Sequence, residues 1–200
     1  ASSMSACLGR LPSASKKIFR CWTSQTNLER LVKNIVANLK VESLLKELHR
    51  LKVEFIIIGG MAAVAQGSAF ITADLDLCYS RKKENLEKLA EALAPFHPLL
   101  RGAPPDLPFC LDVNTLKSGL NFTLTTDLGD LDILGEVTGL GGYNEALAFS
   151  EKVEIFGIRC KVLTLEGLIK TKRAVGRAKD LRLLPELEAL LEIRKSQKKD

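Results

Sequence analysis

Asp74 and Asp76 are the two residues of this chain whose type and spacing most directly indicate chemistry. They follow a mostly apolar run, Val53–Ile58, and the glycine pair Gly59-Gly60. Side chains two residues apart on a strand point to the same face, about 6.6 Å apart along the backbone, so both carboxylates can reach one ligand. Hard oxygen donors of this kind bind Mg²⁺ together with the phosphates of a substrate. The spacing therefore indicates phosphoryl or nucleotidyl transfer.

The elements that must position these aspartates can be predicted from the spacing of apolar residues. A continuous apolar run rich in β-branched residues predicts a strand buried on both faces, and helical spacing predicts a helix. In chain order we expect helices over 28–39 and 44–51 (one helix or two, depending on a break at Lys40–Ser43), a strand at Val53–Ile58, a helix at Met61–Gln66, a strand at Ile71–Tyr79, a helix at Lys82–Leu93, a loop over 95–108, strands at Phe109–Val113, Leu120–Thr125 and Leu131–Val137, a hairpin of Val153–Phe156 with Ile158–Leu163, and helices from Thr164 and over Leu181–Ile193. Pro185 is expected in an early turn of the last helix, because proline disrupts a helix interior. The order predicts an α/β (α+β) fold with a mixed sheet flanked by helices.

Composition places the chain among ordinary globular proteins. It has 200 residues, is 46% hydrophobic and 26% charged, and carries a net charge of +5, which is compatible with nucleotide or RNA ligands. Residues 1–28 contain no acidic residue. We expect residues 1–27 to be a disordered or partly non-native tail, although a transit peptide has the same composition. Residues 28–200 are expected to form a single domain with C-terminal helices from about residue 164.

The cysteines and the hydropathy pattern indicate the cellular compartment and whether a membrane partner is expected. The five cysteines are scattered, with no C-x-x-C pair, so neither a zinc site nor a disulfide framework is indicated. This favours a reducing compartment, the cytoplasm. No apolar run reaches the length of a membrane span, so no membrane partner is expected.

The strand, the Gly-Gly turn, the short helix and the Asp-x-Asp strand together resemble the nucleotidyltransferase-fold superfamily related to DNA polymerase beta. Its fingerprint is an apolar residue, Gly, Gly or Ser, a spacer, and Asp-apolar-Asp-apolar. Here it reads Ile58-Gly59-Gly60, thirteen residues, and Asp74-Leu75-Asp76-Leu77. Leu163–Ile169, followed by Lys172 and Lys179-Asp180, looks like the closing motif of minimal nucleotidyltransferases of the abortive-infection toxin type. The resemblance covers roughly residues 42–193.

This resemblance implies a Mg²⁺-dependent nucleotidyltransferase with two metal ions, or Mn²⁺ in their place, and an NTP as substrate. Asp74 and Asp76 would bind both ions. A later aspartate completes the site in the family, and we assign it by position to Asp132, with Asp130 as the fallback on the same strand face. The acceptor would be a hydroxyl of an RNA such as tRNA, of a protein or of a small molecule, and a toxin-like role with a cognate antitoxin is implied.

The resemblance also implies residues for the nucleotide. Backbone N–H groups after Gly59 and Gly60, at the start of a helix, suit the β- and γ-phosphates. Lys172 or Lys179 would neutralise charge on the triphosphate.

Two departures from the family leave other functions open. Many relatives carry a basic residue in the loop before the aspartates, where this chain has Ser68–Ile71. The turn is Gly-Gly, so it offers no hydroxyl to a phosphate. The alternatives are a nucleotide- or RNA-binding module that has lost turnover, and one partner of a toxin–antitoxin pair whose surface matters more than its site.

Overall fold

The computed structural model describes residues 40–197, apart from residues 70–71, 73 and 105–106 and the side chain of Lys179. The tail expected over residues 1–27 and the helix expected over 28–39 lie outside the described residues. Residues 40–50 form one continuous helix, so the helix has no break between Lys40 and Ser43. Within the described part, none of the helices combines the length and the apolar character needed to cross a bilayer.

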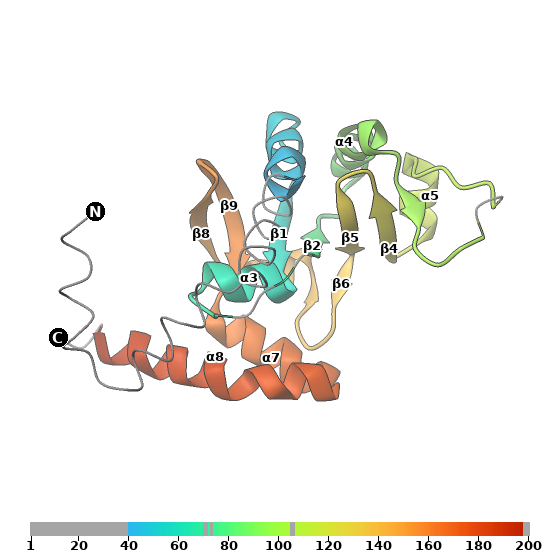
Figure 1. Ribbon diagram of the computed structural model, residues 1–200. Coiled ribbons are helices and arrows are strands. Elements are labelled where there is room, and N and C mark those ends of the chain that lie inside the picture. Colours follow the sequence, from blue (N-terminus) through green and yellow to red (C-terminus); the bar gives the residue numbers. More distant parts are fainter. Residues whose placement is uncertain (1–39, 70–71, 73, 105–106, 198–200) are drawn as a thin grey trace, which may run out of the picture. The chain divides into compact units, whose positions relative to one another are not determined.

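The elements alternate between strands and helices along the first half of the described chain, and end in two helices (Figure 1). In chain order after the 40–50 helix they are β1 (Phe55–Ile58), α3 (Gly59–Ala65), β2 (Leu75–Tyr79), α4 (Lys83–Leu93), a 3₁₀ turn (Ala94–Phe96), β3 (Leu99–Leu100), α5 (Val113–Ser118), β4 (Asn121–Thr126), β5 (Gly129–Leu134), β6 (Glu136–Val137), β7 (Gly141–Gly142), α6 (Tyr143–Leu147), β8 (Ser150–Ile155), β9 (Ile158–Leu163), α7 (Leu165–Val175) and α8 (Ala178–Gln197). The α/β architecture with a mixed sheet and C-terminal helices is confirmed.

Seven strands form one mixed sheet in the order β3-β4-β5-β2-β1-β9-β8. Two of its pairings are parallel, β1 with β9 and β2 with β5, and the others are antiparallel. β1 and β2 lie inside the sheet and are almost entirely buried, as their apolar sequences predict. The sheet therefore places the start of β2 beside the end of β1 and directly alongside β5.

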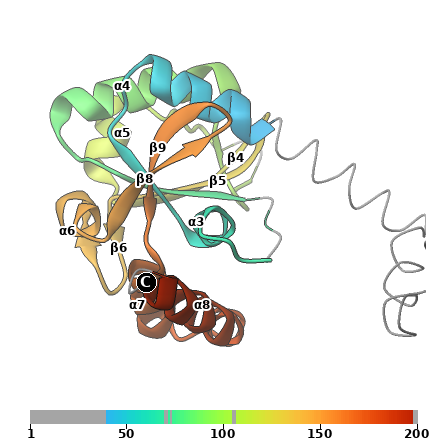
Figure 2. The ribbon, with the colours of Figure 1, turned by 90° about the vertical axis from the view of Figure 1, so that its left-hand side faces the viewer.

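Helices cover both faces of the central strands. α3 and α6 each contact β1 and β2, and Figure 2 shows them on opposite sides of the strands. α7 packs on α8, α3 and β9. The β8–β9 hairpin closes through Phe156 and Gly157, both with positive φ (51° and 73°), the two-residue turn that matches strand twist. The hairpin predicted there is confirmed.

The prediction of a strand at Phe109–Val113 is wrong. Residues 109–112 are irregular, and α5 begins at Val113. Asp112 caps this helix, because its side chain accepts a hydrogen bond from the N–H of Thr115 at 2.7 Å. The loop expected over 95–108 also contains β3, which pairs with β4.

The place expected for Pro185 is also wrong. α8 starts at Ala178, so Pro185 lies in the helix interior. The early start follows from Gly176, which ends α7 in the left-handed conformation at φ 68° and turns the chain straight into α8. A proline there costs about 3 kcal/mol. Burial of Leu183 and Leu187 against the core offsets that cost.

Candidate active site

Asp76 and Asp132 are brought together by the pairing of two parallel strands. They are direct partners in the register of β2 and β5, so their side chains leave the same face of adjacent strands about 4.8 Å apart. Asp74 precedes β2 by one residue, is exposed, and acts electrostatically on both carboxylates. The three aspartates named from the sequence therefore meet at one edge of the sheet, where β1 ends.

Burial, together with the neighbouring charges of Asp132 and Asp74, raises the pKa of the Asp76 carboxyl to about 6. A hydrogen bond donated by the N–H of Gly60 and the charge of Lys172 act in the opposite direction and limit this rise. The pKa of Asp132 is also raised, mainly by burial, although Arg101 partly counteracts this. This edge of the sheet therefore holds more negative charge than its own residues neutralise, which favours a cationic ligand.

The glycine pair makes room for Asp76. Gly59 has φ 63°, and a Cβ there would lie 1.9 Å from Asp76 Oδ2. A Cβ on Gly60 would lie 2.8 Å from Thr72 Cβ and Oγ1. Both positions thus need glycine for close approach of neighbouring side chains. The N–H of Gly60 already donates a hydrogen bond to the Asp76 carboxylate, so its predicted contact with a phosphate stays a prediction.

Arg101 is a residue of this site that the sequence did not single out. Its Nη2 donates to Asp132 Oδ1 at 2.8 Å and to the carbonyl of Leu124 at 3.1 Å. Its Nε lies 3.2 Å from Asp130 Oδ2 without forming a hydrogen bond. The residue follows β3 in a proline-rich segment, where nothing local signals contact with β5. Only the pairing of β3, β4 and β5 places this guanidinium beside the carboxylates.

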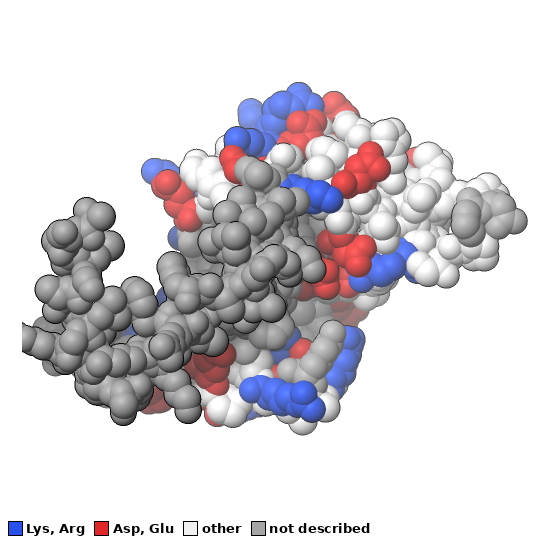
Figure 3. Space-filling model, viewed as in Figure 1, with Lys and Arg blue, Asp and Glu red and all other residues white. Residues whose placement is uncertain are grey.

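Lys172 reaches the site from α7. Its Nζ lies 2.5 Å from Asp180 Oδ1, and both side chains are largely buried, at 17% and 8% exposure. It also acts electrostatically on Asp76, so the structure places this lysine near the carboxylates, and its role in binding the nucleotide stays a prediction. Lys179 lies in α8, but its side chain is outside the described residues. Figure 3 shows acidic and basic side chains side by side at the middle of this face, with further basic ones over α7 and α8.

The carboxylates fit a divalent cation that a substrate helps to bind. Among the described residues, no three His, Cys, Asp or Glu side chains form a ready-made metal cage. Mg²⁺ seldom uses such a cage and is held by one or two carboxylates plus substrate phosphates. Two hard oxygen donors in register match that mode. Asp76 and Asp132 would hold the ion, and Asp74 lies close enough to act on both electrostatically.

Gly59→Ala tests the close approach of the turn to Asp76. Gly157→Ala is the matched control, because Gly157 has a similar φ of 73° and open space around it. An alanine at a left-handed position costs about 1 kcal/mol of unfolding free energy. We expect Gly59→Ala to cost clearly more, and the excess to shrink in an Asp76→Ala background, as measured by urea unfolding. Equal losses in the two single variants would contradict this role of Gly59.

Asp76 should make stability fall as pH rises through the weakly acidic range. Its folded pKa of about 6 lies above the usual aspartate value of 3.8, so between these values the folded state binds more protons than the unfolded one. Stability should decline by up to about 3 kcal/mol from pH 4 to pH 6. In EDTA-containing buffer, Asp76→Asn should lack this decline in urea unfolding.

Asp112→Asn provides a control of opposite sign. The N–H of Thr115 lowers the pKa of Asp112, so this group contributes stability that is lost as pH falls. A pH profile of Asp76→Asn that parallels the wild type would show that Asp76 is not the group responsible.

Comparison with known proteins adds little to this geometry. No protein-family model matches the chain. No curated protein matches it either. Among solved structures, one described as a putative nucleotidyltransferase from Thermotoga maritima is 16% identical, covers 88% of this chain and 96% of its own, and has a TM-score of 0.42. A likeness this distant carries no argument about activity, so the conclusions below rest on the site itself.

Proposed function

We propose that this protein is a metal-dependent nucleotidyltransferase that moves a nucleoside monophosphate from an NTP to a hydroxyl. The observation that carries the proposal is the pairing of Asp76, near the start of β2, with Asp132 on the parallel strand β5, with Asp74 beside them. Clustered carboxylates with raised pKa values are typical of catalytic sites that bind a cation or move a proton. A solvated strand end would not bury two such groups next to each other.

The proposed reaction needs one proton acceptor and a way to hold the triphosphate. The acceptor oxygen bonds to the α-phosphorus, the bond to the bridging oxygen of pyrophosphate breaks, and the hydroxyl proton must leave. Asp132 is the candidate base, because its raised pKa makes it a better proton acceptor near neutral pH. A bound Mg²⁺ or Mn²⁺ pair would stabilise charge on the attacking and leaving oxygens.

Lys172 is the described cation best placed for the triphosphate. Its ammonium group lies within electrostatic reach of Asp76, and Asp180 holds it in place. The side chain approaches from α7, whereas Arg101 approaches from β3. Positive charge thus flanks the carboxylates from two elements that are distant in sequence, which suits a highly charged substrate.

Arg101 gives specific support to a second candidate function, a nucleotide-binding module without turnover. Its ion pair occupies Asp132, the carboxylate assigned to the proton and to one metal ion. If that pair persists in the presence of nucleotide, the site would bind without reacting. The two candidates therefore differ in whether Arg101 leaves Asp132.

The acceptor and the setting remain proposals drawn from the resemblance and the cysteines. An RNA such as tRNA, a protein and a small molecule are the acceptor classes to screen, and a cognate antitoxin is a further candidate partner. We place the activity in the cytoplasm because the described cysteines Cys78, Cys110 and Cys160 are all free thiols.

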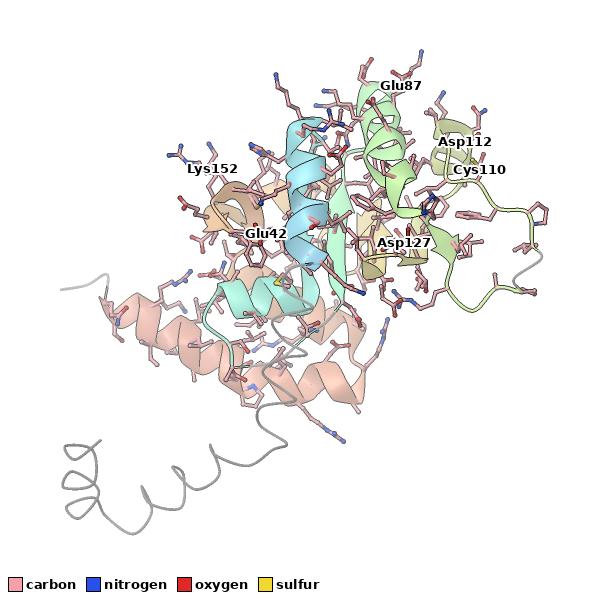
Figure 4. The ribbon with its side chains drawn as sticks, turned by 45° about the horizontal axis from the view of Figure 1, so that its top comes forward. Glu42, Glu87, Cys110, Asp112, Asp127 and Lys152 are labelled. Carbon is pink, nitrogen blue, oxygen red and sulfur yellow. The ribbon has the colours of Figure 1, made fainter. Side chains whose placement is uncertain are left out.

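Asp76→Asn should abolish both nucleotide binding and transfer. We expect thermal stabilisation by at least one of the four NTPs with Mg²⁺ and none with EDTA, and labelled transfer to tRNA or protein that falls at least about 100-fold in the variant. Glu87→Gln is the control, because Glu87 is exposed on α4, which follows the end of β2 opposite to Asp76 (Figure 4). Transfer that survives in Asp76→Asn would refute the assignment, and NTP binding without transfer would favour the second candidate.

Arg101→Gln should increase affinity for a divalent cation without nucleotide. Removing the guanidinium frees Asp132 and Asp130 to face the ion, and a partly exposed pair of this kind is worth about 1 kcal/mol, or roughly fivefold in affinity. Mn²⁺ binding followed by electron paramagnetic resonance measures this directly. Arg173→Gln is the control, because it breaks an exposed arginine pair with Glu188 instead. Unchanged Mn²⁺ affinity in Arg101→Gln would show that this arginine does not compete with the metal.

A further inference from the structure

A second charged site lies at the opposite end of β1 from the carboxylates. A cavity of about 350 Å³ opens beside Phe55, the first residue of β1, whereas Asp76 pairs with Ile58, the last. Three strand steps separate these positions, or about 10 Å. The cavity and the acidic edge therefore belong to the same sheet but lie at opposite ends of β1.

The cavity gathers basic side chains from three parts of the chain. Lys52 follows the 40–50 helix, Arg159 and Lys161 project from β9, and His49 completes the group. Lys52, Arg159 and Lys161 are permanently charged. Among the described residues, none of these three has an acidic side chain within 4 Å of its charged group. Unneutralised cations held together in a cavity repel one another, and an anion would relieve that repulsion.

The β8–β9 ladder adds to the positive charge. Lys152 is the direct partner of Lys161, and like charges directly opposite each other destabilise a sheet. Glu154 is the partner of Arg159 and offsets part of this charge without closing an ion pair. Figure 4 shows Lys152 extending outward from the hairpin, on the side of the molecule away from Asp112.

Tyr143 holds Lys161 in position. Lys161 Nζ donates to the Tyr143 hydroxyl at 2.8 Å and lies 5.3 Å from the centre of its ring. Tyr143 is 7% exposed, so this part of the cavity is fixed by packing. Because its hydroxyl oxygen accepts from the lysine, its own proton remains free to donate to a ligand.

Among the described residues that line the cavity, Glu54 is the one carboxylate, and it already forms an ion pair. Lys82 Nζ lies 3.2 Å from its Oε2. Burial works against its charged form, but Lys82, Ser80 and Lys161 outweigh burial, so the pKa of Glu54 is lowered. Three cations and one carboxylate leave the cavity with two net positive charges, apart from His49.

We propose that this cavity binds the phosphate group of a phosphomonoester. A phosphomonoester carries close to two negative charges at pH 7, which matches the net charge of the cavity. Arginine and lysine donors suit phosphate oxygens, and Tyr143 adds a neutral donor. The volume lies at the lower end of small-ligand sites and exceeds what a bare phosphate needs, so the apolar wall at Phe55 and Val53 contacts the rest of the ligand. The source is a small phosphorylated molecule or the 5′-phosphate of a nucleic acid.

The test is a titration of the full chain with phenyl phosphate in EDTA-containing buffer, followed by amide NMR and calorimetry. Phenol and inorganic phosphate separate the contributions of the ring and of the charge. We expect saturable shifts around Lys161 and Tyr143, and Arg159→Gln should weaken binding about 10- to 100-fold. Arg182→Gln, an exposed arginine on α8, should leave it unchanged. Glu54→Gln should strengthen it, because it removes the negative charge that the described lining of the cavity carries.

The outcomes separate this inference from the proposed activity and identify the source of the phosphate. Asp76→Asn should bind phenyl phosphate as the wild type does, whatever its effect on NTPs. A short RNA with a 5′-phosphate that binds more tightly than phenyl phosphate would identify a nucleic-acid end as the ligand, and a weaker one a small molecule. Absence of saturable shifts, equal losses in Arg159→Gln and Arg182→Gln, or equal binding of RNA with a 5′-hydroxyl would each overturn the proposal.

Discussion

Repulsion between carboxylates that the sheet buries side by side is the constraint on which the rest of this site depends. Asp76 and Asp132 are register partners on parallel strands, so no side-chain rotation can move them to different faces. Burial raises both pKa values, and the charge of Asp132 adds to the difficulty of ionising Asp76. The surrounding elements are arranged to tolerate that charge.

Three elements share this task. The turn between β1 and α3 brings the N–H of Gly60 to Asp76, and the missing side chain of Gly59 leaves space for the carboxylate. Arg101 reaches Asp132 from beyond β3, and Lys172 approaches from α7. Asp76 remains difficult to ionise despite these contacts. A divalent cation, held together with the phosphates of a nucleotide, would neutralise this excess of negative charge.

The two ends of β1 carry opposite charge. Aspartates gather where the strand ends, and unpaired lysine and arginine side chains gather where it begins. A short strand thus separates two environments of opposite sign within one rigid sheet. We propose a ligand for each end, bound by local electrostatics, and we expect a substitution at one end to leave the other unchanged.

The sequence alone determined the local parts of this protein. Hydrophobic runs and period-2 spacing located β1, β2, the β8–β9 hairpin and the two aspartates, because these features depend on residues close in the chain. Capping at Asp112 and the early start of α8 were missed, because both depend on turn geometry that competes with periodicity. Only the tertiary structure decided that Asp132 faces Asp76, that Arg101 covers Asp132, and that Arg159 and Lys161 join Lys52 in a cavity. Strand order and register set these contacts, and they arise from long-range packing that no local pattern encodes.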